Sequence, residues 1–156
     1  MKDAIKIAQQ AKKQGKKIVT TNGCFDILHI GHARYLAEAK RLGDVLIVGV
    51  NGDRSPYFKA KPGRPIVPEK ERAEMLDSLK SVDYVFIFND ETPNKWIGKI
   101  MPNFHVKACD KNYGIEQCVE RFAVQKAGGK VVLIRKIEGK STTKIVEQVL
   151  NAYAKG

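Results

Sequence analysis

Long apolar segments are missing from this sequence, and cysteine and aromatic residues are scarce. No apolar run approaches the roughly 20 residues that a membrane-spanning helix needs, and the first residues show no signal-peptide pattern. The three cysteines, Cys24, Cys109 and Cys118, form no CxxC pair and accompany no histidine cluster, which argues against a disulfide framework or a zinc site. These absences predict a cytoplasmic protein with reduced thiols.

Positive charge is what the sequence has in excess. The 28 lysine and arginine residues outnumber the 17 aspartate and glutamate residues, giving a formal net charge of +11. This surplus favours an anionic partner, which is a phosphorylated metabolite, a nucleic acid or an anionic lipid. Aromatic residues make up only 8% of the chain and offer little surface for stacking bases, so RNA binding is a remote alternative and no membrane partner is expected.

Strand-like and helix-like segments alternate along the whole chain. Apolar, unalternated runs at 45–50, 82–88 and 131–134 are typical of strands covered on both faces, and shorter runs at 17–21 and 105–107 bring the number to five. Helices are expected at 3–14, 31–42, 69–79, 93–100, 116–127 and 142–153, with a loop over 51–68. The alternation predicts a single α/β domain over 1–156, Rossmann-like and three-layered, with a five-stranded parallel sheet and helices on both faces.

Ligands of such sheets bind beyond the carboxyl ends of the strands, so the first candidate is the segment after the first strand. It carries His29 and His32, three residues apart, where a helix is expected to begin. A helix N-terminus attracts phosphate, Gly31 lets the backbone approach a ligand closely, and two imidazoles can donate hydrogen bonds to a phosphate as its charge grows. The other residues expected to form this nucleotide-binding loop are Asn22, Gly23, Cys24, Phe25 and Asp26.

A second helix start suited to phosphate follows the fifth strand. Ser141 is the expected N-cap, and Thr142 and Thr143 add two more hydroxyl groups. Such residues also serve as simple caps, but the loops after the first and fifth strands can face each other over one crevice. This helix start is therefore expected to hold the outer phosphates of a nucleotide, with Arg135 as a catalytic cation beside it.

Further candidates lie between these two motifs. The long loop after the second strand carries three cations that can close over a triphosphate, Lys59, Lys61 and Arg64, and Lys59 or Lys61 is expected to neutralise the transferring phosphate group. Arg72 either pairs with a carboxylate for structure or reaches a nucleotide phosphate. Lys107 and Asp110, which follow the fourth strand, are expected to face the nucleotide.

At these residues the sequence resembles the cytidylyltransferase-like branch of the HxGH nucleotidyltransferases, over nearly all of 17–150. Residues 23–32 look like the first motif of that family, and 141–143 with Arg135 upstream look like its last. Within the branch, the segments 21–26 and 63–72 look most like the adenylyltransferase domain of ADP-heptose synthases.

This resemblance implies transfer of AMP from ATP to a heptose 1-phosphate, with release of pyrophosphate. It also implies Mg²⁺ bound with the nucleotide phosphates, and a homodimer. No covalent intermediate or general base is implied, because the attacking phosphate is already ionised and positioning with charge stabilisation can carry the rate.

Three features depart from the heptose pattern. Ala108 and Cys109 stand where the heptose enzymes usually carry two glycines, and the segment 55–58 is more aromatic. The final motif over 138–145 is closer to that of glycerol-3-phosphate cytidylyltransferases. A CTP-dependent glycerol-3-phosphate cytidylyltransferase and a flavin adenylyltransferase of the same branch therefore remain as alternatives, with an RNA-binding module further off.

Overall fold

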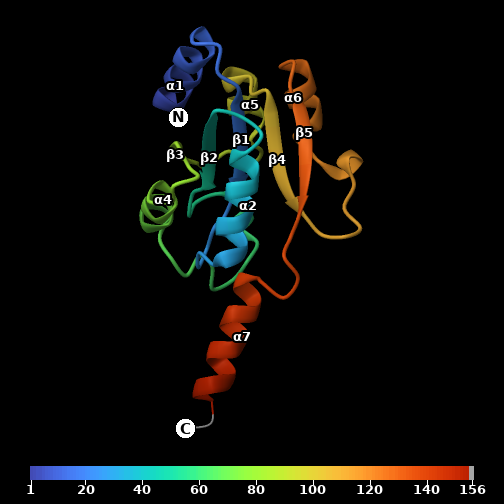
Figure 1. Ribbon diagram of the computed structural model, residues 1–156. Coiled ribbons are helices and arrows are strands. Elements are labelled where there is room, and N and C mark those ends of the chain that lie inside the picture. The colour runs from blue at the N-terminus through green and yellow to red at the C-terminus, as the bar shows by residue number, and fades with distance from the viewer. Residues whose placement is uncertain (155–156) are drawn as a thin grey trace.

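The computed structural model describes residues 1–154, and its centre is one sheet of five parallel strands (Figure 1). The strands are β1 (Ile18–Gly23), β2 (Val45–Asn51), β3 (Tyr84–Phe88), β4 (Phe104–Cys109) and β5 (Lys130–Arg135). Their order across the sheet is β3-β2-β1-β4-β5, so the direction of winding reverses between β1 and β4. The predicted α/β fold is confirmed, and its topological switch point lies between these two central strands.

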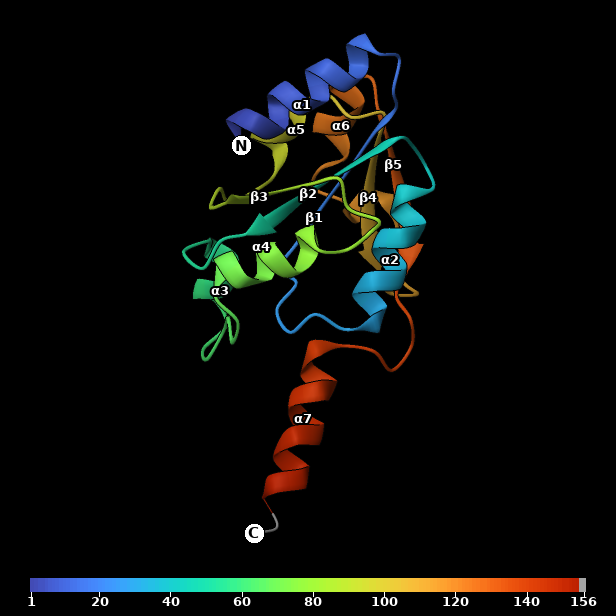
Figure 2. The same ribbon diagram turned by 60° about the vertical axis from the view of Figure 1, so that its left-hand side comes forward.

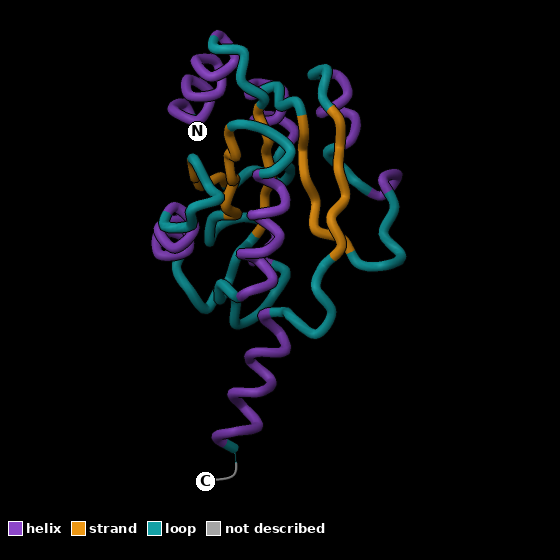
Figure 3. The backbone as a smooth tube through the Cα atoms, viewed as in Figure 1, coloured by secondary structure: helices purple, strands orange, loops and turns teal. Residues whose placement is uncertain are grey.

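Helices cover both faces of this sheet (Figure 3). One face carries α1 (Lys2–Lys13), α5 (Asn94–Ile100) and α6 (Arg121–Lys126), and the other carries α2 (Ile30–Lys40) and α4 (Glu69–Asp77). Alternate residues of β2 serve the two cores, since Ile47 packs with Trp96 on one face while Leu46 and Val48 pack with Leu36 on the other. Burial on both faces explains why the strands are continuously apolar in sequence.

Two predicted segments differ from the structure. The loop expected over 51–68 contains a short helix, α3 (Pro56–Lys59). The single helix expected over 116–127 is a 3₁₀ turn, η1 (Ile115–Gln117), followed by α6. The chain is extended at Cys118, which breaks the helix, and this turn allows Glu120 to be buried beside a lysine of β4. A tertiary ion pair has overridden the local helical pattern.

The last helix, α7 (Thr142–Tyr153), starts near the carboxyl ends of the strands and extends away from the sheet, opposite α1 (Figures 1 and 2). All of its residues are exposed or half-buried. Val149, Leu150 and Tyr153 are 51%, 62% and 82% exposed and share one side of the helix, because Tyr153 follows the other two by four and three residues. Among the described helices, none is both long enough and apolar enough to cross a membrane.

Candidate active site

The loop after β1 turns sharply into α2 through two unusual backbone conformations. Phe25 and Ile27 both have φ of 51°, in the left-handed region that non-glycine residues rarely adopt. Such residues cost about 1–3 kcal/mol each and gather at ligand-binding loops, where the surrounding structure holds them in place. The ring of Phe25 is 5% exposed and meets the ring of His32 edge-on at 5.4 Å, which fixes the loop against the first turn of α2.

The two histidines orient each other through backbone amides. The amide of Gly31 donates to Nδ1 of His29 at 3.1 Å, and the amide of His29 donates to Nδ1 of His32 at 3.4 Å. Since both Nδ1 atoms accept, each neutral ring carries its proton on Nε2. The amide of Gly31, at the start of α2, is thus taken by an imidazole. The two Nε2–H groups are the donors left for a ligand.

Burial keeps both rings neutral. It lowers the pKa of His32 to about 4, helped by the charge of neighbouring His29, and it lowers the pKa of His29, helped by Lys140. The rings are stacked with their centroids 3.9 Å apart, so two positive charges would repel strongly there. At neutral pH the site therefore offers two hydrogen-bond donors without two full charges.

Gly31 is required by the packing of His29. A Cβ at position 31 would lie 2.8 Å from Cε1 of the His29 ring and 3.3 Å from Cβ of Lys140. Any side chain there would displace the imidazole. Gly31 was predicted to let a ligand approach the backbone closely. The structure adds a second role, because the absence of a side chain leaves room for the His29 ring.

The start of α7 meets the loop after β1. Ser141 caps the helix, with its Oγ accepting from the amide of Lys144 at 3.2 Å, as the sequence predicted. The hydroxyl of Thr142 donates to the backbone carbonyl of Asp26 at 2.6 Å. The two motifs are therefore joined directly, and the N-termini of α2 and α7 border the same space.

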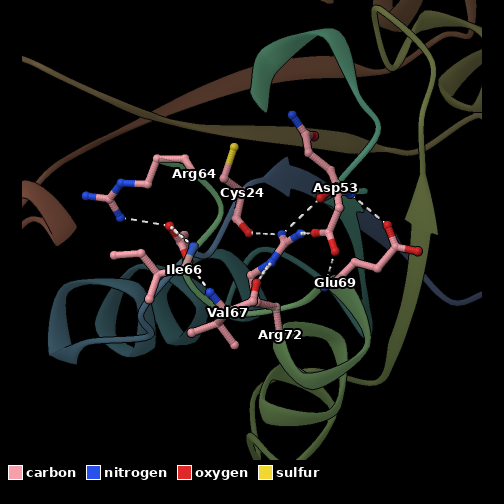
Figure 4. Close-up of polar contacts among 9 residues, drawn as sticks. Cys24, Asp53, Arg64, Ile66, Val67, Glu69 and Arg72 are labelled. Carbon is pink, nitrogen blue, oxygen red and sulfur yellow. Dashed lines mark hydrogen bonds and ion pairs between the residues drawn. The ribbon is translucent and has the colours of Figure 1, made fainter. Parts of the chain in front are cut away.

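The carboxylate of Asp26 anchors the segment before α4, and its donors Arg64, Ile66 and Val67 are labelled in Figure 4. It pairs with Arg64 at 2.7 Å and accepts from the amides of Ile66 and Val67, at 3.1 Å and 2.9 Å to Oδ1. Burial alone would raise the pKa of Asp26, but these donors outweigh it and hold the pKa below its usual value. Asp26 therefore shapes the loop, as expected, through a carboxylate that is already fully occupied.

Arg72 takes the structural one of its two expected roles. Its side chain is 1% exposed, and Nη2 pairs with Asp53 at 2.6 Å while Nη1 and Nε donate to the carbonyls of Cys24, Asn51 and Val67 (Figure 4). It does not line the pocket. The expectation of a nucleotide contact at Arg72 is corrected, because its donors hold the ends of β1 and β2 together.

A pocket of about 610 Å³ lies at the switch point, a size typical of small-ligand sites. Fourteen predicted site residues line it: Asn22, Gly23, Cys24, Phe25, Asp26, His29, Gly31, His32, Lys61, Lys107, Arg135, Ser141, Thr142 and Thr143. Burial raises the pKa of Cys24 to about 11, so this residue is a protonated thiol at neutral pH. The loops after β1 and β5 face each other over this pocket, as the sequence predicted.

Two further predicted residues lie outside the pocket lining. Lys59 is exposed at the end of α3, whereas Lys61 lines the pocket, lies 4.1 Å from the ring centroid of Tyr57 and donates to its hydroxyl. Asp110 is exposed and pairs with Lys136 at 2.9 Å. Of the lysine pair, Lys61 is thus the one placed to meet a ligand, and the expected nucleotide contact at Asp110 is not supported.

Arg135 lines the pocket and also ties down the loop after β4. Its Nη1 donates to the carbonyls of Asp110 and Lys111, the latter at 2.9 Å. At the end of β4, Ala108 is exposed to the pocket, while Cys109 is 2% exposed and its thiol lies 3.5 Å from the carbonyl of Ile134. Of the two residues that replace the usual glycines, only Ala108 therefore faces the pocket.

Several lining residues were not among the sequence candidates. They are Arg34, Tyr35, Glu38, Asn51, Tyr57, Phe58, Ala108, Ile134, Lys136, Ile137 and Lys140, whereas Arg64, which also lines the pocket, was expected as a loop cation. Arg34 and Glu38 lie one turn apart on α2, a spacing that could have placed them on the face below the histidines. The others come from segments whose approach to the pocket depends on tertiary packing.

The fold, the switch-point pocket and the paired histidines at a helix start define a nucleotidyltransferase domain. Residues 20–148 match the family described as cytidylyltransferase-like. The chain belongs to this family, and the resemblance predicted from the two motifs is confirmed.

Curated relatives include three proteins described as bifunctional protein HldE. The chain is 49% identical over 143 residues to that of a Nitratiruptor species, with 92% of this chain and 30% of the relative covered. It is 46% identical over 140 residues to that of Citrifermentans bemidjiense, covering 90% and 28%, and 42% identical over 150 residues to that of Syntrophotalea carbinolica, covering 96% and 30%. The chain thus spans about three tenths of these relatives' length.

A solved structure has a related fold. The crystal structure of the lipopolysaccharide core biosynthesis protein from Thermoplasma volcanium has a TM-score of 0.65 and 29% sequence identity. The match covers 81% of this chain and 100% of that one.

Proposed function

We propose that this domain transfers AMP from ATP to a heptose 1-phosphate and releases pyrophosphate. The observation that carries the proposal is the meeting of two helix N-termini at one pocket that is also lined by His29 and His32, whose Nδ1 atoms are occupied by backbone amides. Helix N-termini suit polyphosphate, and neutral N–H donors suit the oxygen atoms of a transferring phosphoryl group.

In the proposed reaction, a phosphate oxygen of the acceptor attacks the α-phosphorus of the nucleotide. A new P–O bond forms there, the bond to the bridging oxygen of the β-phosphate breaks, and pyrophosphate carries away the electron pair. The acceptor phosphate is already ionised, so no residue has to remove a proton. His29 and His32 donate to oxygens whose charge grows, and Lys61 adds a positive charge. The start of α7 receives the outer phosphates through Ser141 and Thr143, since the hydroxyl of Thr142 is donated to Asp26.

Mg²⁺ is part of the proposal as a companion of the nucleotide. Within residues 1–154 no group of three or more histidine, cysteine, aspartate or glutamate side chains is arranged to hold a metal ion. This fits Mg²⁺, which usually binds through substrate phosphates and water and needs few protein ligands. The ion would neutralise charge on the phosphates.

The heptose acceptor and the adenine base rest on likeness to other proteins. The segments resembling ADP-heptose synthases, the HldE relatives and the lipopolysaccharide core biosynthesis protein all point in this direction. The second candidate is transfer of CMP from CTP to glycerol 3-phosphate, which the final motif over 138–145 favours. A flavin acceptor has no specific observation in its favour.

Pyrophosphate release tests the proposal. Purified protein with Mg²⁺ is given ATP or CTP, each with heptose 1-phosphate or glycerol 3-phosphate. Release with ATP and the heptose phosphate alone is the expected result. Release only with CTP and glycerol 3-phosphate would move the protein to the second candidate, and tight RNA binding without turnover in any of the four mixtures would overturn both.

The homodimer implied by the resemblance also remains a proposal. The exposed apolar side of α7, formed by Val149, Leu150 and Tyr153, is the surface we assign to it. Light scattering is expected to give twice the monomer mass for the native chain and the monomer mass for Val149→Glu with Leu150→Glu. A native chain that is monomeric at all concentrations would contradict this assignment.

A further inference from the structure

A buried carboxylate that belongs to neither sequence motif lies beside the pocket. Glu120, between η1 and α6, is 2% exposed, and its Oε1 is 2.6 Å from Nζ of Lys107 on β4. Its other oxygen lies 3.1 Å from the thiol of Cys118. The helix predicted over 116–127 is interrupted at this point, and the interruption brings the carboxylate to the lysine.

The lysine connects this carboxylate to the ligand space. Lys107 leaves β4 next to β1, so it stands at the switch point, and its Nζ lies 3.4 Å from Oδ1 of Asn22. Both Lys107 and Asn22 line the pocket, and the lysine side chain is 21% exposed. An ammonium group has three N–H donors. Glu120 and Asn22 accept two of them, which leaves a third for a ligand.

Stability alone does not account for the pair. Moving a carboxylate and an ammonium out of water costs as much as their attraction returns, and apolar residues of the same size often serve a fold as well. Burial by itself would raise the pKa of Glu120, but the charge and hydrogen bond of Lys107 leave it lowered, so the carboxylate is ionised. The arrangement thus fixes a charged ammonium at the pocket.

The groups around the pair are neutral. Burial lowers the pKa of His105 on β4 to about 3, assisted by Lys107, and its Nδ1 lies 2.9 Å from Oγ1 of Thr20. Burial raises the pKa of Cys118 to about 11, and it raises the pKa of Tyr35 on α2 well above its usual value. Glu120 is therefore the partner that sets the direction of the Lys107 side chain.

We infer that Glu120 is a positioning residue, which holds the ammonium of Lys107 at the β1–β4 switch point so that its free N–H donates to a phosphate oxygen of the nucleotide or of the acceptor. This inference rests on the proposed function, because it needs a phosphorylated ligand in this pocket. It adds a residue, distant from both motifs, on which ligand binding depends.

The test is a double-mutant cycle with binding and turnover as readouts. The variants are Glu120→Gln, Lys107→Met and the two combined, with Glu116→Gln as the matched control, because Glu116 is 76% exposed at its side chain and lies on η1. The dissociation constant of ATP is measured by calorimetry without acceptor, and that of the acceptor phosphate separately. KM and kcat follow with both substrates present.

Glu120→Gln is expected to weaken one of these ligands about tenfold, the scale of one hydrogen bond to a charged group, and to raise its KM more than it lowers kcat. In the Lys107→Met background the same change is expected to have no further effect. A loss for ATP assigns the free N–H to the nucleotide, and a loss for the acceptor assigns it there. Equal losses with and without Lys107, or unchanged binding of both ligands, would overturn the inference.

Two provisions keep the result separate from folding and from the proposed function. If Glu120→Gln does not fold, Glu120→Asp takes its place, which keeps the charge on a side chain shorter by one methylene. This variant is expected to weaken binding of one of the two ligands in the same way. If the native chain binds ATP but transfers nothing, the proposed function fails while the binding cycle still decides the role of Glu120.

Discussion

The hydroxyl of Thr142 donates a 2.6 Å hydrogen bond to the backbone carbonyl of Asp26, joining residues that are 116 positions apart in sequence. This bond ties the start of α7 to the loop that precedes His29. Because the carboxylate of the same Asp26 holds Arg64 and the amides of Ile66 and Val67, three segments around the pocket meet at one residue. The geometry of the phosphate site depends on this junction.

Thr142→Val is expected to weaken ATP binding about fivefold, because it removes one neutral hydrogen bond while keeping the shape of the side chain. Thr142→Ser, which keeps the hydroxyl, is the control and should bind like the native chain. Calorimetry with ATP distinguishes the two. Native affinity in the valine variant would show that α7 is held in place by other contacts.

His32→Ala is expected to lower turnover about a hundredfold or more, the usual effect of losing one transition-state donor. The melting temperature should stay close to that of the native chain, since the ring is only partly buried at the pocket. His32→Gln, which retains an N–H donor, should recover part of the rate. Near-native turnover in the alanine variant would show that His32 does not stabilise the transition state.

The parallel sheet and the two phosphate-suited helix starts could be predicted because each depends on local patterns. Continuous apolar runs marked strands buried on both faces, and the histidine and hydroxyl motifs stood at the strand ends where such folds bind ligands. Once the strands were placed, the meeting of the loops after β1 and β5 followed from the topology.

What the sequence did not indicate depends on side-chain direction and tertiary pairing. Lys59 and Lys61 are two residues apart, yet only Lys61 lines the pocket. Asp110 turns to Lys136 on the surface, and Glu120 reaches Lys107 across a broken helix that appears continuous in sequence. Local spacing carries no information about these pairings.

Arg72→Met is expected to destabilise the protein by about 3 kcal/mol, because it leaves Asp53 without its cation and three half-buried carbonyls without donors. Urea unfolding measures this loss, with Lys70→Met, an exposed neighbour on α4, as the control. If the variant instead kept its stability and lost ATP binding, Arg72 would be a phosphate ligand after all.

The protein is expected to lose stability as the pH falls below 6.5, before its carboxylates begin to protonate. The pKa values of His32 and His105 are lowered from 6.5 to about 4 and about 3. Below pH 6.5 these two histidines therefore bind protons in the unfolded chain but stay neutral in the folded chain. Each histidine then lowers the unfolding free energy by up to about 1.4 kcal/mol per pH unit.

Asp26 and Glu120 have lowered pKa values, so their contributions are lost only below their usual values of 3.8 and 4.5. Unfolding free energies between pH 6.5 and 5 therefore report mainly on histidines. His32→Gln should make this slope shallower, and an unchanged slope would show that His32 is protonated in the folded state.

Transfer of the AMP group is tested most directly by following the α-phosphate of ATP. The native chain is incubated with Mg²⁺, heptose 1-phosphate and ATP labelled with ³²P at the α-position, and the products are separated. Label is expected in a sugar nucleotide, with an equal amount of pyrophosphate, and almost none is expected there when His29 and His32 are both replaced by alanine. Label that remains in ATP or appears in ADP, or transfer that survives loss of both histidines, would contradict the proposed reaction.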